Sequence, residues 1–340
     1  MSHGARTGRR RRPRVSMHDV ADAAGVSAMT VSRALRDPTL VSDETLAAVQ
    51  EAIESTGYQR NAVASALASG RTHSIGLITW IDTEYVPNAL LEEFDRAVRA
   101  AGYSARIESM EVRSEAAILA AYNRLRAQGV DGIVAPRSAE LARAGVVDVP
   151  TVVQDSRIDT GGPARVVLDW AAAGRLATDH LLDLGHATVH HVAGPTGMRA
   201  WTDRTAGWRS ALRARGCPVP ALARGDATHE SGDRAARALL EDPDVTAIFA
   251  GNDQMAVGAA HAVRTVGRRC PEDVSIIGID DIPGLAFHAV PLSTIRFDLR
   301  SYAERTVSEL VALIERDEPA TSFRVSPTLV VRGSTAAPPV

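Results

Sequence analysis

The chain has 340 residues, of which 45% are hydrophobic, and a formal net charge of −3. Such a length and composition indicate a globular protein of two or three domains and exclude a chain that is disordered throughout. All 38 cationic residues are arginines, which excludes a P-loop lysine, a Schiff-base lysine and a kinase strand lysine. The motifs G-x-G-x-x-G and G-x-S-x-G do not occur either, so we expect no enzyme.

The sequence also bears on compartment and cofactors. No stretch approaches the roughly 18 consecutive apolar residues of a membrane span, and no apolar run follows the basic start, so we expect neither a span nor a signal peptide. We therefore expect a cytoplasmic protein. Cys217 and Cys270 lie too far apart in sequence for a disulfide framework or a metal-ligand pair. We expect both to be reduced and structural, and expect no metal and no other cofactor.

The N-terminal segment concentrates positive charge. Residues 1–14 contain six arginines and no acid, whereas residues 15–71 contain four arginines and seven acids. We expect 1–14 to be a basic disordered arm. It is either a solvated tail or, beside a DNA-binding element, a source of non-specific phosphate attraction that weakens with salt.

Residues 15–60 have the pattern of three helices. Ser16 and Asp19 have the spacing of a capping box that begins the first helix. Gly25 is expected to end that helix, and Ser27 to cap the second. Two short helices around a glycine turn predict a helix-turn-helix, although a small helical domain without a DNA function is the alternative.

The second helix has two different faces. Val31 and Leu35 are one turn apart and should face inward. The opposite face consists of Met29, Arg33 and Arg36. A third helix starts at Ser42, and its apolar residues at helical spacing are expected to pack over the other two: Leu46, Val49 and Ile53.

Residues 61–72 should connect this domain to the rest of the chain. The stretch NAVASALASG is rich in alanine and small residues, so it can form one short helix that is marginal in isolation. A flexible alanine and serine linker is the alternative.

From His73 onward, short β-branched runs alternate with helical or loop segments. The runs are SIGLITW, GVDGIVAP, PTVVQD, ARVVLD, TVHHVAG, VTAIFAG and SIIGID. Alternation of this kind predicts parallel α/β sheets. The segment is too long for one such sheet.

Tryptophans and polar residues gather at the predicted strand ends, where open α/β sheets bind ligands. Trp80, Trp170 and Trp201 suit the apolar face of a sugar, or else cover a hydrophobic edge. Trp208, inside a helical segment, is expected in the core. A guanidinium, an amide and a carboxylate can together hold vicinal hydroxyls, and the chain offers these groups at or near strand ends in Arg204, Asn252 and Asp280.

Two other groups of residues might suggest catalysis. Asp280 and Asp281 are adjacent, so they should point in opposite directions, with one in the cleft and the other acting as a helix cap. The histidines have no nearby nucleophile and no metal-ligand spacing. We therefore expect four structural histidines, His180, His186, His190 and His191.

The runs DVADAAGVSAMTVSRAL and TGYQRNAVASALASGRTHSIGL resemble the N-terminal signature of the lac repressor (LacI/GalR) family of bacterial transcription regulators. The similarity continues to LVVRGST, covering roughly residues 15–334. The resemblance implies an N-terminal all-α helix-turn-helix DNA-binding domain and an α/β periplasmic-binding-protein-like core of two parallel-sheet subdomains.

The resemblance also implies domain boundaries within an effector-binding core of residues 73–334. The N-subdomain is expected at about 73–168 and 297–325, and the C-subdomain at about 169–296 and 326–334. The chain would cross between them near Asp169, Arg296 and Ser326, leaving a tail of residues 335–340.

In the family frame, Ala28 and Met29 take the positions that vary with operator sequence, and Arg33 can bridge guanine O6 and N7. Leu67 takes the position of the hinge leucine that enters the minor groove. One departure is Arg60, where the family usually has proline. The DNA-binding residues implied are Ser16, Ser27, Ala28, Met29, Thr30, Ser32, Arg33, Arg36, Ser42, Tyr58, Asn61, Ala64 and Leu67.

The family's effector contacts match Arg204, Asn252 and Asp280, and Asp155 matches a further one in sugar-responsive members, although it could be a turn residue. With the tryptophans, the effector-binding residues expected are Trp80, Asp155, Trp170, Trp201, Arg204, Asn252 and Asp280. We expect a homodimer on a pseudo-palindromic operator, because the chain stops soon after LVVRGST, without the extra helix of tetrameric members.

The function expected is a repressor of carbohydrate-utilisation genes that a small molecule, such as a sugar, releases from its operator. The alternatives are a corepressor-type regulator that responds to a purine or another metabolite, and a sugar-binding uptake protein.

Overall fold

The computed structural model describes residues 15–58, 70–80, 85–112, 114–136, 141, 148–155, 165–316 and 321–339. The chain divides into two compact units, Met1–Thr72 and His73–Val340. The basic arm and residues 59–69, including the expected hinge contacts Asn61, Ala64 and Leu67, lie outside the described residues. Within the described part, no helix has both the length and the apolar character to cross a membrane.

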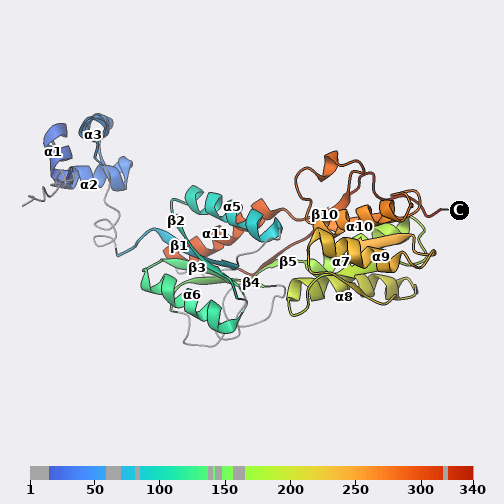
Figure 1. Ribbon diagram of the computed structural model, residues 1–340. Coiled ribbons are helices and arrows are strands. Elements are labelled where there is room, and N and C mark those ends of the chain that lie inside the picture. The colour runs from blue at the N-terminus through green and yellow to red at the C-terminus, as the bar shows by residue number, and fades with distance from the viewer. Residues whose placement is uncertain are drawn as a thin grey trace, which may run out of the picture. The chain divides into compact units, whose positions relative to one another are not determined.

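The described part of the first unit is a bundle of three α-helices (Figure 1), and its local signals act as predicted. The Ser16–Asp19 capping box is present, and Gly25 ends the first helix in the left-handed conformation. Val20, Val31 and Val49 are at most 1% exposed and form the centre of the core. The elements are α1 (Met17–Ala24), α2 (Ala28–Arg36), a short 3-10 turn η1 (Pro38–Leu40) and α3 (Asp43–Thr56).

The second unit contains two six-stranded sheets. The first sheet has the order β11-β5-β4-β3-β1-β2, and all its strand pairs are parallel. Its helix α6 packs on one face, where Ile78 and Ile133 point, while α5 and α11 pack on the other, where Ile75 and Leu77 point. These elements are β1 (Ser74–Trp80), α5 (Tyr85–Ala100), β2 (Ser104–Met110), α6 (Glu115–Ala127), β3 (Gly132–Pro136), β4 (Thr151–Asp155), β5 (Arg165–Leu168), α11 (Leu299–Arg316) and β11 (Phe323–Val325).

The second sheet has the order β12-β10-β9-β8-β6-β7. Only the β10–β12 pair is antiparallel among the pairs described for this sheet. Helices α7 and α8 cover one face, and α9 and α10 the other. These elements are α7 (Trp170–Asp183), β6 (His190–Ala193), α8 (Arg199–Ala214), β7 (Ala223–Arg224), α9 (His229–Leu239), β8 (Ala247–Ala250), α10 (Asp253–Thr265), β9 (Ser275–Ile279), η2 (Leu285–Phe287), β10 (Ser293–Arg296) and β12 (Thr328–Val330).

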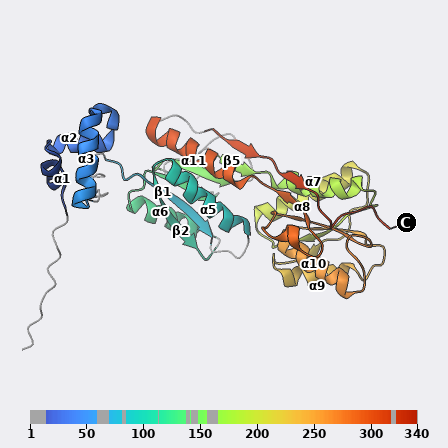
Figure 2. The same cartoon turned by 90° about the horizontal axis from the view of Figure 1, so that it is seen from above.

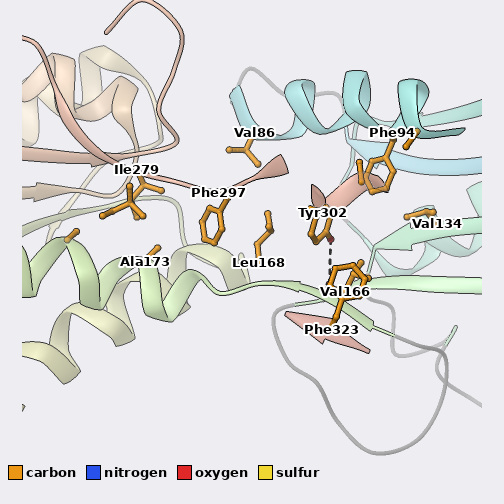
Figure 3. Close-up of a cluster of buried hydrophobic side chains, with 14 of the residues drawn as sticks. Val86, Phe94, Val134, Val166, Leu168, Ala173, Ile279, Phe297, Tyr302 and Phe323 are labelled. Carbon is orange, nitrogen blue, oxygen red and sulfur yellow. Dashed lines mark hydrogen bonds between the residues drawn. The ribbon is translucent and has the colours of Figure 1, made fainter. Parts of the chain in front are cut away.

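The chain passes between the two sheets three times, after β5, after β10 and after β11. Figure 2 shows the result: α5, α6 and α11 surround one sheet, and α7 to α10 surround the other. One buried apolar cluster continues through the crossing region, where Leu168 and Phe297 lie between residues of the two sheets (Figure 3). The crossing segments are therefore packed against side chains and are not loose linkers.

The sequence analysis missed some strands and misassigned one carboxylate. The seven apolar runs all form strands, but β2, β7 and β10 to β12 were not predicted. Asp281 is not a helix cap as expected, because its carboxylate is 2.6 Å from a guanidinium nitrogen of Arg332. Ala336, expected in the tail, exchanges two hydrogen bonds with the Ser275 hydroxyl of β9.

Candidate functional site

Helix α2 presents one face to solvent. Ser27 caps it, because its hydroxyl accepts a hydrogen bond from the Thr30 amide at 3.0 Å. Met29 is 71% exposed and Arg33, one turn later, is also exposed. Val31 points into the core. An exposed guanidinium on the outward face of a second short helix is the arrangement that a major groove accepts.

The other residues expected to contact DNA differ in their exposure and in their roles within the helices. Ser16 and Ser42 cap α1 and α3 through their hydroxyls. Ser32 is exposed, while Ala28, Thr30 and Tyr58 are half-buried. The side chain of Arg36 lies outside what the structure describes.

In the second unit, Arg204 of α8 lies between two tryptophans. Its guanidinium carbon is 4.0 Å from the ring centroid of Trp170 and 4.2 Å from that of Trp201. One terminal nitrogen donates a hydrogen bond of 2.6 Å to the carbonyl of Gly251. Arg204 is only 3% exposed. Cation–π contact on both faces is worth most when the cation is desolvated, as here.

Trp201 is closely packed. Its ring lies so close to Gly194 that a Cβ there would be 2.2 Å from Trp201 Cε3, and a Cβ on Gly251 would be 2.8 Å from Cζ3. Arg204 covers it as well. Trp201 is 3% exposed and packs on Arg204, and its contact with an effector stays a prediction.

Asp280 reaches Arg204 from the end of β9. Its Oδ1 is 3.7 Å from Arg204 Nη2, and both side chains are at most 4% exposed. The structure thus brings together two of the predicted effector residues, at the strand ends where a ligand is expected. A ligand with hydroxyl groups would find a carboxylate acceptor and guanidinium donors side by side.

Asn252 has a different environment. It caps α10, since its Oδ1 accepts from the Met255 amide at 2.9 Å, and its amide nitrogen donates to the Ala227 carbonyl at 3.1 Å. The side chain is 1% exposed. These bonds occupy much of its capacity, so its expected contact with an effector remains a proposal. Asp155 ends β4, but its side chain lies outside the described part.

A cavity of about 160 Å³ lies beside Arg204. Trp80, Trp170 and Trp201 line it, together with Thr79 and Gln154, which the sequence analysis did not select. Both of these polar residues sit at the ends of strands β1 and β4, so their strand-end positions were the available signal. Its apolar wall is formed by residues of α5, namely Val86, Leu90, Leu91 and Phe94.

His191 and Trp208 lie in the interior of the second unit. His191 Nδ1 donates to the Phe249 carbonyl at 2.9 Å, and its Nε2 accepts from the Thr205 hydroxyl at 3.2 Å. Complete burial lowers the pKa of His191 to about 3. Trp208 is fully buried. The described residues contain no group of three or more His, Cys, Asp or Glu side chains that could hold a metal ion.

Two family models match the chain. The model described as "Bacterial regulatory proteins, lacI family" matches residues 16–61, and the "Periplasmic binding protein-like domain" matches residues 178–335. The chain is 30% identical to the lactose operon repressor of Escherichia coli (strain K12) over 330 residues, which cover 95% of this chain and 91% of the relative. The chain belongs to the lacI family of bacterial regulatory proteins.

Further members of the family are similar over most of their length. The regulator CelR of Thermobifida fusca is 34% identical over 84% of this chain and 87% of its own. The repressor PurR of Klebsiella pneumoniae subsp. pneumoniae is 30% identical over 95% of this chain and 98% of its own. The fold matches the lac repressor dimer bound to operator and the anti-inducer ONPF, with a TM-score of 0.84, 29% identity and coverage of 95% of this chain and all of the other.

Proposed function

We propose that this protein is a transcriptional repressor of carbohydrate-utilisation genes that binds a pseudo-palindromic operator as a homodimer and is released by a sugar. The single observation that supports this most strongly is the combination within one chain of an exposed Arg33 on α2 with the Arg204–Asp280 pair at strand ends of the second unit. The first suits a DNA groove and the second suits hydroxyl groups.

DNA contact in this proposal comes mainly from helix α2. Arg33 reads guanine, and Met29 discriminates by shape and by contact with thymine methyls. The remaining contacts proposed are Ser16, Ser27, Ala28, Thr30, Ser32, Arg36, Ser42, Tyr58, Asn61, Ala64 and Leu67. The lac repressor structure described above is a dimer bound to operator, which supports the dimeric form.

The effector in this proposal binds beside Arg204 and Asp280. A regulator of this fold, CelR, has been solved as its cellobiose complex and matches this chain with a TM-score of 0.67, 29% identity and coverage of 94% of this chain and all of the other. That supports a sugar effector here. The contacts proposed are Trp80, Asp155, Trp170, Trp201, Arg204, Asn252 and Asp280. We place the protein in the cytoplasm and propose no enzymatic turnover.

The test is a fluorescence anisotropy titration of operator DNA, obtained by selecting binding sequences from a random duplex pool with the full chain. Mono- and disaccharides, starting with cellobiose, are then added to the complex. We expect one of them to weaken operator binding at least tenfold, and Arg204→Ala to abolish that response while leaving sugar-free DNA binding intact. Arg213→Ala is the matched control, because Arg213 is an exposed arginine on the same helix.

The same titration separates the proposal from a corepressor. PurR is a relative at similar identity, so purine bases are included among the ligands. A ligand that strengthens operator binding would replace the inducer mechanism with corepression. Absence of any sequence-specific DNA binding would overturn the proposal as a whole and favour a sugar-binding uptake protein.

A further inference from the structure

The turn that follows β9 has an unusual backbone. Asp280 has φ 126° and Asp281 has φ 53°, both in the left-handed region that residues with a Cβ rarely adopt. Such conformations are energetically unfavourable and persist only where the surroundings impose them. The groups that impose this turn therefore also determine where the Asp280 carboxylate lies.

Asp253 holds the turn from inside the subdomain. It is fully buried at the start of α10, and its Oδ2 accepts from the Ile282 amide at 3.0 Å. Its Oδ1 accepts from the Thr294 hydroxyl at 2.6 Å, and the same hydroxyl accepts from the Asp281 amide at 3.4 Å. A Cβ on Gly278 would be 2.1 Å from Asp253 Oδ1, so glycine is needed for the carboxylate to reach this place.

The side chain of Asp281 anchors the turn through two arginines. Its Oδ1 is 2.6 Å from Arg332 Nη2, and its Oδ2 is 3.4 Å from Arg296 Nη1. Arg332 also donates to the carbonyl of Leu292 at 2.8 Å. The Asp281 side chain is 12% exposed. A carboxylate that is largely buried needs its ion-pair partners to stay charged. Removing one partner therefore destabilises the folded protein.

The partners of Asp281 belong to the segments that cross between the two sheets. Arg296 is the last residue of β10, before the chain crosses to α11. Its carbonyl accepts a hydrogen bond of 3.2 Å from the hydroxyl of Thr328, the first residue of β12 after another crossing. Two crossing segments thus meet at Arg296, which Asp281 contacts.

The two adjacent aspartates of this turn therefore contact different partners. Asp280 faces Arg204 at 3.7 Å, while the adjacent Asp281 faces Arg296 and Arg332. We propose that Asp253 and Asp281 are positioning residues that fix Asp280 beside Arg204 and transmit its displacement by a ligand to the crossing segments. This inference deepens the proposed function and rests on it, since it concerns the same cleft.

The first test needs neither DNA nor an effector. Amide hydrogen exchange is followed by mass spectrometry on the full chain for Asp281→Asn. We expect at least fivefold faster exchange at residues 280–284, and also at 296–299 and 328–330, because the turn and the crossing segments lose their shared anchor. Unchanged exchange in both crossing segments would overturn the proposal.

The matched control is Asp273→Asn. Asp273 pairs with Arg269 at 2.9 Å on the same subdomain, so its loss removes a carboxylate and an ion pair of similar length. We expect faster exchange there only near residues 268–274. If Asp281→Asn fails to fold, Thr294→Val replaces it, since valine keeps the shape and removes only the hydroxyl that links Asp281 to Asp253. The same three segments must then exchange faster for the proposal to stand.

The second test separates positioning from simple structural support. With cellobiose as the first probe, we expect Asp281→Asn to weaken sugar binding, because Asp280 is held less firmly, and, at sugar concentrations that saturate the variant, to reduce the release of operator at least tenfold. Normal release in the variant would contradict transmission. If wild type itself does not bind operator or respond to sugar, the proposed function fails, and the exchange experiment still decides whether the turn and the crossing segments are linked.

Discussion

The guanidinium of Arg204 and the indole of Trp201 stack 4.2 Å apart, measured from the guanidinium carbon to the ring centroid. The ring is itself held against Gly194 and Gly251. Each side chain therefore limits the movement of the other. Because Arg204 is already held in place, a ligand that matches its position loses little free energy to ordering this side chain on binding.

Gly194→Ala tests this stacking. The added Cβ would lie 2.2 Å from Trp201 Cε3, so the buried ring has to shift. We expect the free energy of unfolding to fall by about 1–3 kcal/mol, as for other overpacked sites, and sugar affinity to fall with it. Urea denaturation measures the first effect. Gly333→Ala is the control, because its nearest neighbour, Pro291 Cδ, would be 3.2 Å away; equal losses in the two variants would refute the argument.

Arg33→Ala and Met29→Ala should differ in how they affect operator recognition. Bidentate contact of arginine with guanine is worth about 1–3 kcal/mol of discrimination, whereas Met29 offers only apolar contact. We expect Arg33→Ala to lose more specificity than Met29→Ala across a set of operators with single base changes. Anisotropy titrations at fixed salt provide the data, since salt alone changes affinity. Similar losses at every base would disprove the assignment.

Ser16→Ala should destabilise the helical unit. The change removes the hydroxyl that accepts from the Asp19 amide at 3.3 Å and donates to Asp19 Oδ2 at 2.8 Å. We expect a loss of about 1 kcal/mol, measured as the free energy of unfolding of the helical unit by circular dichroism. Ser32→Ala, an exposed position within α2, should be neutral or slightly stabilising. A cap without effect would mean that tertiary packing alone holds α1.

His191 should make the second unit sensitive to acid. Burial lowers its pKa from 6.5 to about 3 in the folded protein, so the fold favours the neutral ring. The stability that this ring contributes is complete above about pH 6.5 and is lost as the pH falls toward 3. Burial shifts the pKa values of His180, His186 and His190 in the same direction.

The check is urea denaturation of wild type and His191→Gln at pH 7.5, 6.0 and 5.0. Glutamine can keep hydrogen bonds to Phe249 and Thr205 but does not titrate. We expect the wild type to lose its advantage over the variant as the pH falls. His229→Gln, at an exposed position, is the control and should show no such trend. A constant gap between wild type and His191→Gln would contradict the prediction.

Signals within a few residues of each other determined the helical unit. The caps at Ser16, Ser27 and Ser42 and the left-handed Gly25 act over one helical turn, so the sequence alone places α1 to α3. The seven apolar runs likewise revealed buried strands, since parallel strands covered on both faces are apolar throughout. Edge strand β2 was missed because its exposure alternates irregularly, with Ile107 45% exposed.

Only the tertiary structure decided what the candidate site residues do. The sequence placed Trp201, Arg204 and Asp280 at strand ends, but it could not show that Trp201 packs on Gly251 and Arg204, or that Arg204 meets Asp280 across a gap of 76 positions. Nor could it show that Asp281 pairs with Arg332 rather than capping a helix. The physical reason is range: capping and periodicity act between near neighbours in the chain, whereas stacking and ion pairing depend on which distant segments the fold brings within a few ångströms.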